Sequence, residues 1–291
     1  MANLNILGFP KRVTSLINPV KVTRNTLWRY GSGISQEPHV FVVGAPRSGT
    51  TLMFTVLRSH PAFSAIDSET FFFVPRDVFN LNSYKRLSNL GAPSSQETAE
   101  LLATSKDLIN FYDNVAKFIN MRDGGKRFLE KTPFHVLYLK FLTKHFPKAK
   151  FINMIRDGRD CYISNKRLDP HFHKPLSRFA PLWRDSIKSR QSLGEHSQII
   201  DIKYEEFTHN PAKITQQIMN FIGEDFLEQQ IDPNYYSKSK IFKGYSGHER
   251  LSQPIKPSSI GKWREKLTVQ EIEVFNSIAG RELKQLEYEI S

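Results

Sequence analysis

The 291-residue sequence lacks features that define several classes of protein. It has one cysteine, Cys161, so no disulfide can form within the chain, which excludes a disulfide-stapled secreted domain and favours a reducing compartment. No run of apolar residues approaches the roughly 18 positions that a membrane-spanning helix requires. Metal-site patterns such as HExxH and paired cysteines are also missing, so we expect no metal ion in the site.

Acidic residues are missing from the first 36 positions, which carry five basic ones: Lys11, Arg12, Lys21, Arg24 and Arg29. Pro10 and Pro19 interrupt any long helix there. We therefore expect residues 1–37 to form a basic arm lying over one domain that spans residues 38–291. A second interpretation of the arm, a peripheral membrane-surface or organelle-targeting segment, stays open.

The remaining composition is that of an ordinary folded protein, with 39% hydrophobic and 24% charged residues, so wholesale disorder is excluded. The formal net charge of +12 predicts attraction to anions without identifying the anion. A basic nucleic-acid-binding protein is therefore one alternative. The charge is spread through the chain, however, and we find no helix-turn-helix, zinc or RNP signature, so we expect no nucleic-acid partner.

Short apolar runs alternate with helical patterns from residue 39 onward. We expect strands at residues 39–43, 128–129, 150–155 and 199–202, and helices at 50–59, 136–146, 158–168, 211–222 and 272–286. This alternation predicts an α/β fold: a single domain whose central parallel sheet is flanked by helices on both faces. Residues 232–262 are rich in Lys, Ser, Gly, Pro and Tyr and predict a long loop, which often carries binding residues.

Residues 44–51, GAPRSGTT, lie between the first expected strand and the first expected helix. Glycines let the backbone N–H groups of such a loop turn inward, and the helix N-terminus adds partial positive charge. A nucleoside-triphosphate P-loop has a lysine where Thr50 stands, and Arg47 inside the loop replaces it in part. The sequence thus predicts a P-loop-type domain that binds a nucleotide phosphate, but not in the usual manner of ATP.

A second candidate phosphate site follows the third expected strand. Arg156 stands at the end of that strand, and Ser164 lies two turns into the next helix. A guanidinium group suits phosphate better than a lysine does, because it donates two parallel hydrogen bonds. The alternative is a surface network of arginines and acids that caps the helix through Asp157 and Asp160.

These motifs together resemble the sulfotransferases that use 3′-phosphoadenosine 5′-phosphosulfate (PAPS), with most similarity to the branch of tyrosylprotein and bacterial sulfotransferases. The resemblance extends over most of residues 39–265. It implies that PAPS is bound at its 5′-phosphosulfate by Arg47, Ser48, Gly49, Thr50 and Thr51. It assigns the 3′-phosphate to Arg156 and Ser164, and places Tyr204 near the adenine.

Residues 255–263, IKPSSIGKW, resemble the loop that covers the nucleotide in this family. The resemblance makes Lys256, Ser258 and Lys262 candidates for nucleotide binding, with Ser252 as a weaker one. We expect the product to be adenosine 3′,5′-bisphosphate (PAP).

The same resemblance names catalytic residues. Glu69, in the sequence DSET, matches the glutamate that acts as base, and Lys131, in EKTP, matches the branch's lysine. Sulfuryl transfer is expected to be an in-line displacement, by analogy with phosphoryl transfer, in which negative charge builds on the departing phosphate oxygen. Lys131 and Arg47 would stabilise that charge without a metal, and Glu69 would take the proton of a hydroxyl or phenol acceptor. His135 is a second choice of base.

The identity of the acceptor stays open among small molecules, glycans, lipids and peptides, as does a homodimer. Aromatic residues that could line its pocket, or equally a core or a dimer contact, are Phe71, Phe72, Phe73, Tyr235, Tyr236 and Tyr245. A P-loop kinase of a small molecule is the main alternative enzyme, and a sulfotransferase scaffold without activity is another. Golgi members of the family have membrane anchors and disulfides. This sequence shows neither feature, so we expect the chain to be cytoplasmic.

Overall fold

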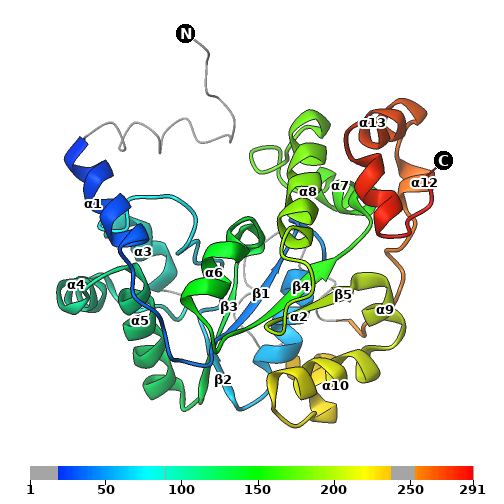
Figure 1. The fold of residues 1–291 in the computed structure, drawn as a ribbon. Coiled ribbons are helices and arrows are strands. Elements are labelled where there is room, and N and C mark those ends of the chain that lie inside the picture. Colours follow the sequence, from blue (N-terminus) through cyan, green and yellow to red (C-terminus); the bar gives the residue numbers. More distant parts are fainter. Residues whose placement is uncertain (1–18, 89, 237–252, 291) are drawn as a thin grey trace.

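The computed structural model describes residues 19–88, 90–236 and 253–290. Its centre is a five-stranded sheet in the order β2-β3-β1-β4-β5, and every strand pairing is parallel (Figure 1). The strands are β1 (Val40–Gly44), β2 (Phe63–Ala65), β3 (Arg127–Lys131), β4 (Lys150–Ile155) and β5 (Ile199–Lys203). Because helices cover both faces of this sheet, the predicted fold class is confirmed.

Alternate side chains of β1 supply the two halves of the core. Phe41 and Val43 pack on one face with residues of α5 (Leu108–Asp123) and α6 (Leu139–His145). Val40 and Val42 pack on the other face with α2 (Thr50–Arg58) and α10 (Pro211–Ile222). Every residue of β1 is buried, which explains why its sequence is an unbroken apolar run rather than an alternation.

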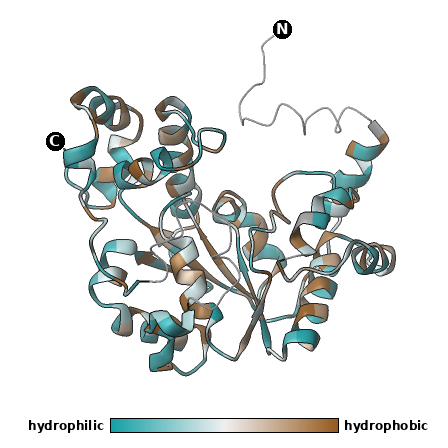
Figure 2. Cartoon of the chain, turned by 180° about the vertical axis from the view of Figure 1, so that it is seen from behind, coloured by the Kyte–Doolittle hydropathy of each residue, from teal (hydrophilic) through white to brown (hydrophobic). Residues whose placement is uncertain are grey.

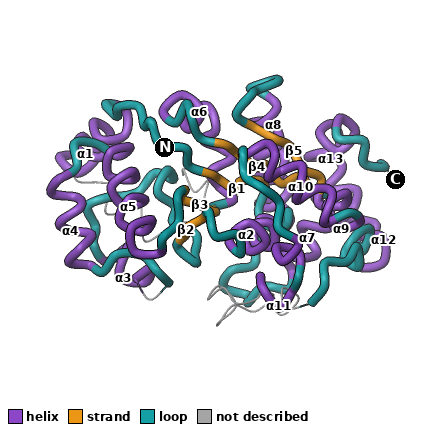
Figure 3. The backbone as a smooth tube through the Cα atoms, turned by 90° about the horizontal axis from the view of Figure 1, so that it is seen from below, coloured by secondary structure: helices purple, strands orange, loops and turns teal. Residues whose placement is uncertain are grey.

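A third cluster of buried side chains lies beside the sheet. It joins α7 (Gly158–Lys166), α8 (Leu176–Gln191), α12 (Trp263–Lys266) and α13 (Val269–Gln285) around Trp183 and Phe275. Figure 3 shows α7, α9 (Tyr204–His209), α12 and α13 gathered toward the β5 end of the sheet. At the β2 end it shows α1 (Pro19–Tyr30), α3 (Asn82–Ser88), α4 (Ser95–Thr104) and α5. In Figure 2 hydrophobic residues concentrate on the central strands and the inward sides of the helices.

Local sequence signals set the ends of several helices. Asp157 caps α7 by accepting a hydrogen bond from the Arg159 N–H, and α13 begins with a capping box between Thr268 and Glu271. Pro211 opens α10, which ends at Gly223 in a left-handed conformation. These signals explain why the expected helices at 50–59, 158–168, 211–222 and 272–286 are confirmed within a few residues.

The expected helix at 136–146 is wrong as one continuous element. Residues Pro133–Tyr138 form the 3₁₀ helix η2, and only Leu139–His145 form the α-helix α6. The sequence pattern also did not predict β2 or the helices α1, α3, α4, α5 and α8. The expected loop at 232–262 begins with the short helix α11 (Pro233–Tyr236), and residues 237–252 lie outside the described residues.

Part of the expected N-terminal arm is a helix packed on the domain. In α1 the Trp28 ring lies 4.5 Å from that of Phe79, and Arg29 Nη1 donates to the Phe73 carbonyl at 2.6 Å. Pro19 begins this helix, where its missing N–H costs nothing. The boundary between residues 37 and 38 stays a prediction, and residues 1–18 lie outside the described residues.

No helix in the described part of the chain combines the length and the apolar character needed to cross a membrane.

Replacement of Phe41 by alanine tests the central packing of the sheet. Phe41 is fully buried, and its ring stacks 5.0 Å from that of Phe151 and 5.6 Å from that of Tyr112. We expect Phe41→Ala to lower the free energy of unfolding by about 3–5 kcal/mol in urea titrations, because it leaves a cavity. Phe172→Ala is the control, since Phe172 is 67% exposed, and an equal loss there would contradict this account.

Candidate active site at the carboxyl edge of the sheet

The loop between β1 and α2 passes very close to its neighbours. A Cβ atom on Gly44 would lie 2.4 Å from the Met154 carbonyl oxygen, and one on Gly49 would lie 2.5 Å from the Tyr204 ring. Both glycines have positive φ angles, as does Arg47 at 72°, so the loop is tightly curled toward the start of α2. Ser48 Oγ is buried with no hydrogen-bond partner among the described residues. An unpartnered buried hydroxyl in a cradle of close backbone is suited to an anionic oxygen.

The two phosphate sites expected from the sequence lie together. Arg47 Nε donates to Ser164 Oγ at 3.1 Å, and Arg156 Nη1 donates to the Arg47 carbonyl at 3.3 Å. This proximity follows from the topology, since β1 and β4 are hydrogen-bonded neighbours whose carboxyl ends meet at one edge. Burial lowers the pKa of the Arg47 guanidinium, Glu69 opposes that shift, and Arg156 adds to it.

Arg156 contacts the Arg47 carbonyl, the Ser259 carbonyl and the Tyr204 ring. Its Nη2 donates to the Ser259 carbonyl at 2.8 Å, and its guanidinium lies 4.3 Å from the centroid of the Tyr204 ring. The Arg156 Nε is buried without a hydrogen-bond partner in the described part of the chain. Tyr204 is the first residue of α9 rather than the end of β5, and it fills the space between Gly49 and Arg156. Its predicted position beside an adenine stays a prediction.

Residues 255–263 approach this site through the backbone. The Asp160 carboxylate accepts hydrogen bonds from the Gly261 N–H at 2.7 Å and from the Trp263 N–H at 3.0 Å. Lys256 and Ser258 are exposed, and Lys262 pairs with Glu265 at 3.5 Å. The roles of these three side chains in nucleotide binding therefore stay predictions, and Ser252 lies outside the described residues. Sequence analysis missed the Ser259 carbonyl, which carries no side-chain signal.

The two catalytic candidates form an ion pair. Lys131 ends β3, and its Nζ lies 3.1 Å from Glu69 Oε1. The Lys131 side chain is 4% exposed, whereas that of Glu69 is 32% exposed and so remains accessible to an acceptor. Glu69 also influences the pKa of Arg47, so these three groups lie in one neighbourhood.

A buried glutamate ties together the segments that carry Glu69 and Lys131. Glu130 Oε1 accepts hydrogen bonds from Thr70 Oγ1 at 2.7 Å and Thr132 Oγ1 at 2.6 Å. Thr132 Oγ1 in turn accepts from the Thr70 and Phe71 N–H groups at 3.1 and 3.2 Å. Thr70, which follows Glu69, and Thr132, which follows Lys131, are thus both hydrogen-bonded to the carboxylate of Glu130.

His135 completes this buried network. Its Nε2 accepts from the Phe73 N–H at 3.3 Å, and its Nδ1–H donates to Glu130 Oε2 at 2.9 Å. The structure does not support His135 as a second base, because the ring is fully buried and both nitrogens are engaged. Burial alone would raise the pKa of Glu130, but His135 and the two threonine hydroxyls together lower it.

One aromatic pair lies beside the reactive ion pair. The rings of Phe71 and Phe134 are 6.1 Å apart, and Lys174 Nζ lies 5.8 Å from the centroid of Phe134. Burial lowers the pKa of Lys174, and the attraction of Glu69 partly opposes this. Of the other aromatic candidates, Phe72, Phe73 and Tyr236 belong to the core, Tyr235 is 45% exposed, and Tyr245 lies outside the described residues.

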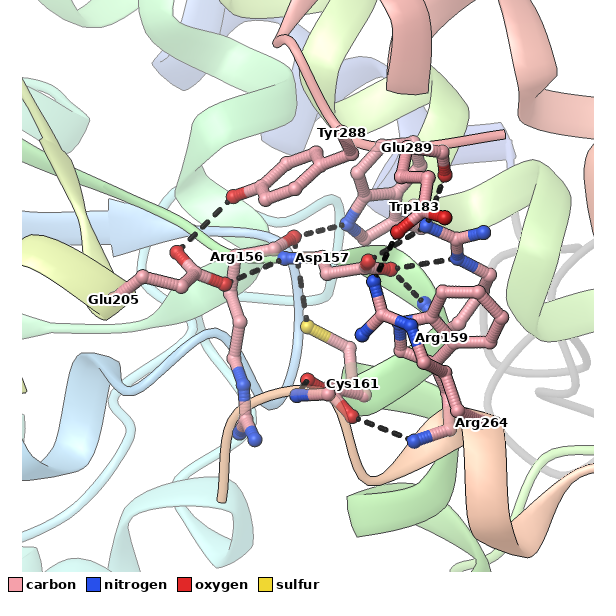
Figure 4. A network of polar contacts seen from close by, with 12 residues as sticks. Arg156, Asp157, Arg159, Cys161, Trp183, Glu205, Arg264, Tyr288 and Glu289 are labelled. Carbon is pink, nitrogen blue, oxygen red and sulfur yellow. Dashed lines mark hydrogen bonds and ion pairs between the residues drawn. The ribbon is translucent and has the colours of Figure 1, made fainter. Parts of the chain in front are cut away.

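A polar network lies behind Arg156 (Figure 4). The Arg156 carbonyl accepts from Trp183 Nε1 at 3.1 Å, and the Asp157 N–H donates to Glu205 Oε1 at 3.1 Å. Arg159 is fully buried and binds both oxygens of Asp157, at 3.0 and 2.8 Å. The sequence pattern offered Asp157 and Asp160 as part of a network that caps the helix, and it gave no signal that Glu205 or Trp183 lies beside Arg156. In the described ranges no group of three or more His, Cys, Asp or Glu residues could hold a metal ion.

Comparison with known proteins bears on this geometry. The sequence model of a group described as "Sulfotransferase family" matches residues 38–228. Protein-tyrosine sulfotransferase 2 of Gallus gallus is 25% identical over 250 residues, which cover 78% of this chain and 63% of that protein. The chain spans between 31% and 65% of the length of the first three curated relatives it matches.

Solved structures show the same fold. The sulfotransferase domain of the Synechococcus PCC 7002 olefin synthase has a TM-score of 0.64 at 19% identity, covering 91% of this chain and 99% of that one. A mouse sulfotransferase complexed with PAP has a TM-score of 0.52 at 17% identity, covering 90% of this chain and 95% of that one.

Substitution of Glu130 by glutamine tests the buried network. Because the pKa of Glu130 is lowered on folding, its charge stabilises the fold above the unfolded pKa, near 4.3, and that contribution is lost as the pH falls. We expect Glu130→Gln to lower the free energy of unfolding by about 1–3 kcal/mol at pH 7. The difference from the wild type should shrink below about pH 4 in urea titrations.

The matched control for this substitution is Glu273→Gln, on the exposed surface of α13. We expect it to change the free energy of unfolding by less than about 0.5 kcal/mol. A deficit of Glu130→Gln that stayed constant from pH 7 to pH 3.5 would contradict the assignment of a stabilising buried charge.

Proposed function

The chain belongs to the sulfotransferase family, and on this basis we propose that it transfers the sulfuryl group of PAPS to a hydroxyl or phenol acceptor. The observation that carries the proposal is the junction of Arg47, Ser164 and Arg156 at one sheet edge, next to the ion pair of Glu69 and Lys131. A doubly phosphorylated adenosine has two anionic ends, and the two basic positions give each end a partner.

The donor suits the residues at this edge. Ser48 Oγ and Arg156 Nε are buried polar atoms without partners in the described part of the chain, so each can bind an anionic oxygen without losing another bond. Ser48, Gly49, Thr50 and Thr51 would hold the 5′-phosphosulfate at the N-terminus of α2. Arg156 and Ser164 would hold the 3′-phosphate. Thr50 in place of the P-loop lysine, together with the family membership, disfavours the kinase alternative.

The chemistry needs a base on the acceptor and a cation on the leaving group. As the bond between sulfur and the acceptor oxygen forms and the bond to the phosphate oxygen breaks, charge collects on the departing phosphate. Lys131 and Arg47 would stabilise that charge, and a preorganised donor of this kind contributes on the order of 10²–10³ in rate. Glu69 would take the acceptor proton. The ammonium and the carboxylate are 3.1 Å apart, so base and cation would act at adjacent points.

Among the open acceptor classes, a phenol has specific support. The curated relative from Gallus gallus is a protein-tyrosine sulfotransferase, and tyrosine is a phenol. The pair of Phe71 and Phe134, 6.1 Å apart, offers half-buried aromatic surface beside the base. A small-molecule, glycan, lipid or peptide acceptor, the cytoplasmic location and a homodimer are kept as the other predictions from the sequence.

Replacement of Arg156 by alanine tests the donor site. We expect PAP to bind the wild type and the dissociation constant to rise at least about tenfold in Arg156→Ala, because a charged hydrogen-bond donor to phosphate is lost. Isothermal calorimetry at pH 7 measures it. Arg281→Ala, on the exposed face of α13, should bind PAP like the wild type. Equal affinity of Arg156→Ala and the wild type would remove the 3′-phosphate assignment.

Glu69 is tested by its amide isostere. Glu69→Gln should lower kcat by about 10²–10⁴, because the base is lost, while the affinity for PAP changes less than twofold. The assay follows transfer from labelled PAPS across a panel of phenols, sugars, lipids and peptides. Glu100→Gln, on the exposed side of α4, is the control. Full turnover by Glu69→Gln would reject its role as base.

A further inference from the structure

The segment that follows α13, residues 286–290, lies against the turn between β4 and α7 (Figure 4). The two are about 130 positions apart in sequence, and the segment is outside the region that matches the family. We infer that Tyr288 and Glu289 are positioning residues of the nucleotide site: they hold the Arg156 turn and the loop at 255–263 in the arrangement that would bind the 3′-phosphate. This inference rests on the proposed function.

Tyr288 acts on the turn through Glu205. Its hydroxyl donates to Glu205 Oε2 at 3.1 Å, and Glu205 Oε1 accepts from the Asp157 N–H at 3.1 Å. That N–H belongs to the peptide that joins Asp157 to Arg156. Burial raises the pKa of both Glu205 and Tyr288, so this hydrogen bond lies in a poorly solvated place where its loss is costly. Tyr288 therefore fixes the backbone from which the Arg156 side chain projects.

Glu289 acts on the turn and the loop together. Its carbonyl accepts from Arg159 Nη2 at 2.7 Å, and its carboxylate pairs with Arg264. The two guanidinium groups face the Trp263 ring, with Arg159 3.6 Å and Arg264 4.5 Å from its centroid. Trp263 is 3% exposed and ends the loop at 255–263. Glu289 thus holds the two arginines that pack around the Trp263 ring.

The loop at 255–263 contacts Arg156 directly, so its position determines how Arg156 is held. The Asp160 carboxylate accepts from the Gly261 and Trp263 N–H groups, and the Ser259 carbonyl accepts from Arg156 Nη2. A loop held at Trp263 presents Ser259 to Arg156 before any ligand is present. Because ordering a loop on binding costs free energy, a loop already in place gives tighter binding. Loss of the contacts at 288–289 should then weaken nucleotide binding without removing any group that touches the nucleotide.

The experiment uses Tyr288→Phe and Glu289→Ala in the full chain, with PAP as the probe. Calorimetry at 25 °C should give a dissociation constant about three- to tenfold higher for each variant. The heat-capacity change of binding should become more negative, because the loop now orders when PAP binds. Trypsin should cleave after Lys262 faster than in the wild type, and PAP should slow that cleavage.

Two further comparisons make the result specific. Arg264→Ala should weaken PAP binding at least as much as Glu289→Ala, because it removes both the ion pair and the guanidinium that faces Trp263. The double variant should bind PAP like Arg264→Ala alone, because the ion pair is already lost there. Arg184→Ala breaks an exposed ion pair with Asp185 on α8, 2.9 Å long, and should leave PAP binding unchanged. Thermal unfolding of each variant confirms that it is folded at 25 °C.

The outcomes separate the two proposals. If the wild type does not bind PAP, the proposed function fails, and this inference fails with it. If the wild type binds PAP and the variants bind it with the same affinity and heat-capacity change, the inference alone is overturned. A lower melting temperature without a change in PAP binding would mean that residues 288–289 serve stability only.

Discussion

The site depends on keeping two arginines of the same charge side by side at the carboxyl edge of the sheet. Arg156 donates to the carbonyl of Arg47, and the positive charge of Arg156 adds to the lowering of the Arg47 pKa that burial causes. Such an arrangement is unfavourable by itself and must be maintained by the surrounding fold. Hydrogen bonds to Ser164 and Ser259, and the Tyr204 ring under Arg156, maintain it. A ligand with two phosphate groups would relieve the repulsion, and the proposed function requires a ligand of this kind.

Acidic residues around this pair divide into structural and reactive ones according to burial. Glu130 is fully buried and its two oxygens accept three hydrogen bonds, so it holds neighbouring segments together and is not accessible to a substrate. Asp160 likewise binds backbone N–H groups of a distant loop. Glu69 differs, because it is 32% exposed and bound to a single lysine. Environment rather than residue type therefore distinguishes the proposed base from the buried acids around it.

In the proposed site, the donor half and the acceptor half differ in how they are built. The donor half uses curled backbone, a helix N-terminus and two arginines. Hydrogen bonds to carbonyls and a hydroxyl from distant parts of the chain hold these arginines in place. The acceptor half uses side chains from separate segments, with Phe71 and Phe134 next to Glu69 and Lys174. Backbone sites demand particular glycines and turns, and a change of acceptor requires only new side chains.

The amino-acid sequence by itself determined the parts of this protein that depend on neighbouring residues. The apolar run at 39–43 with its glycine loop, and Arg156 followed by a capped helix, could be located because strand, turn and cap signals are local. The sequence alone did not reveal the helices between residues 82 and 123, the break of the 136–146 helix, or the buried Glu130 with His135. Only the tertiary structure brought Glu69 to Lys131 and residues 288–289 to the Arg156 turn, because those contacts join positions 62 to 130 residues apart. Contacts at such separations leave no periodic or spacing signal in a single sequence, since they are decided by how the sheet and its helices pack.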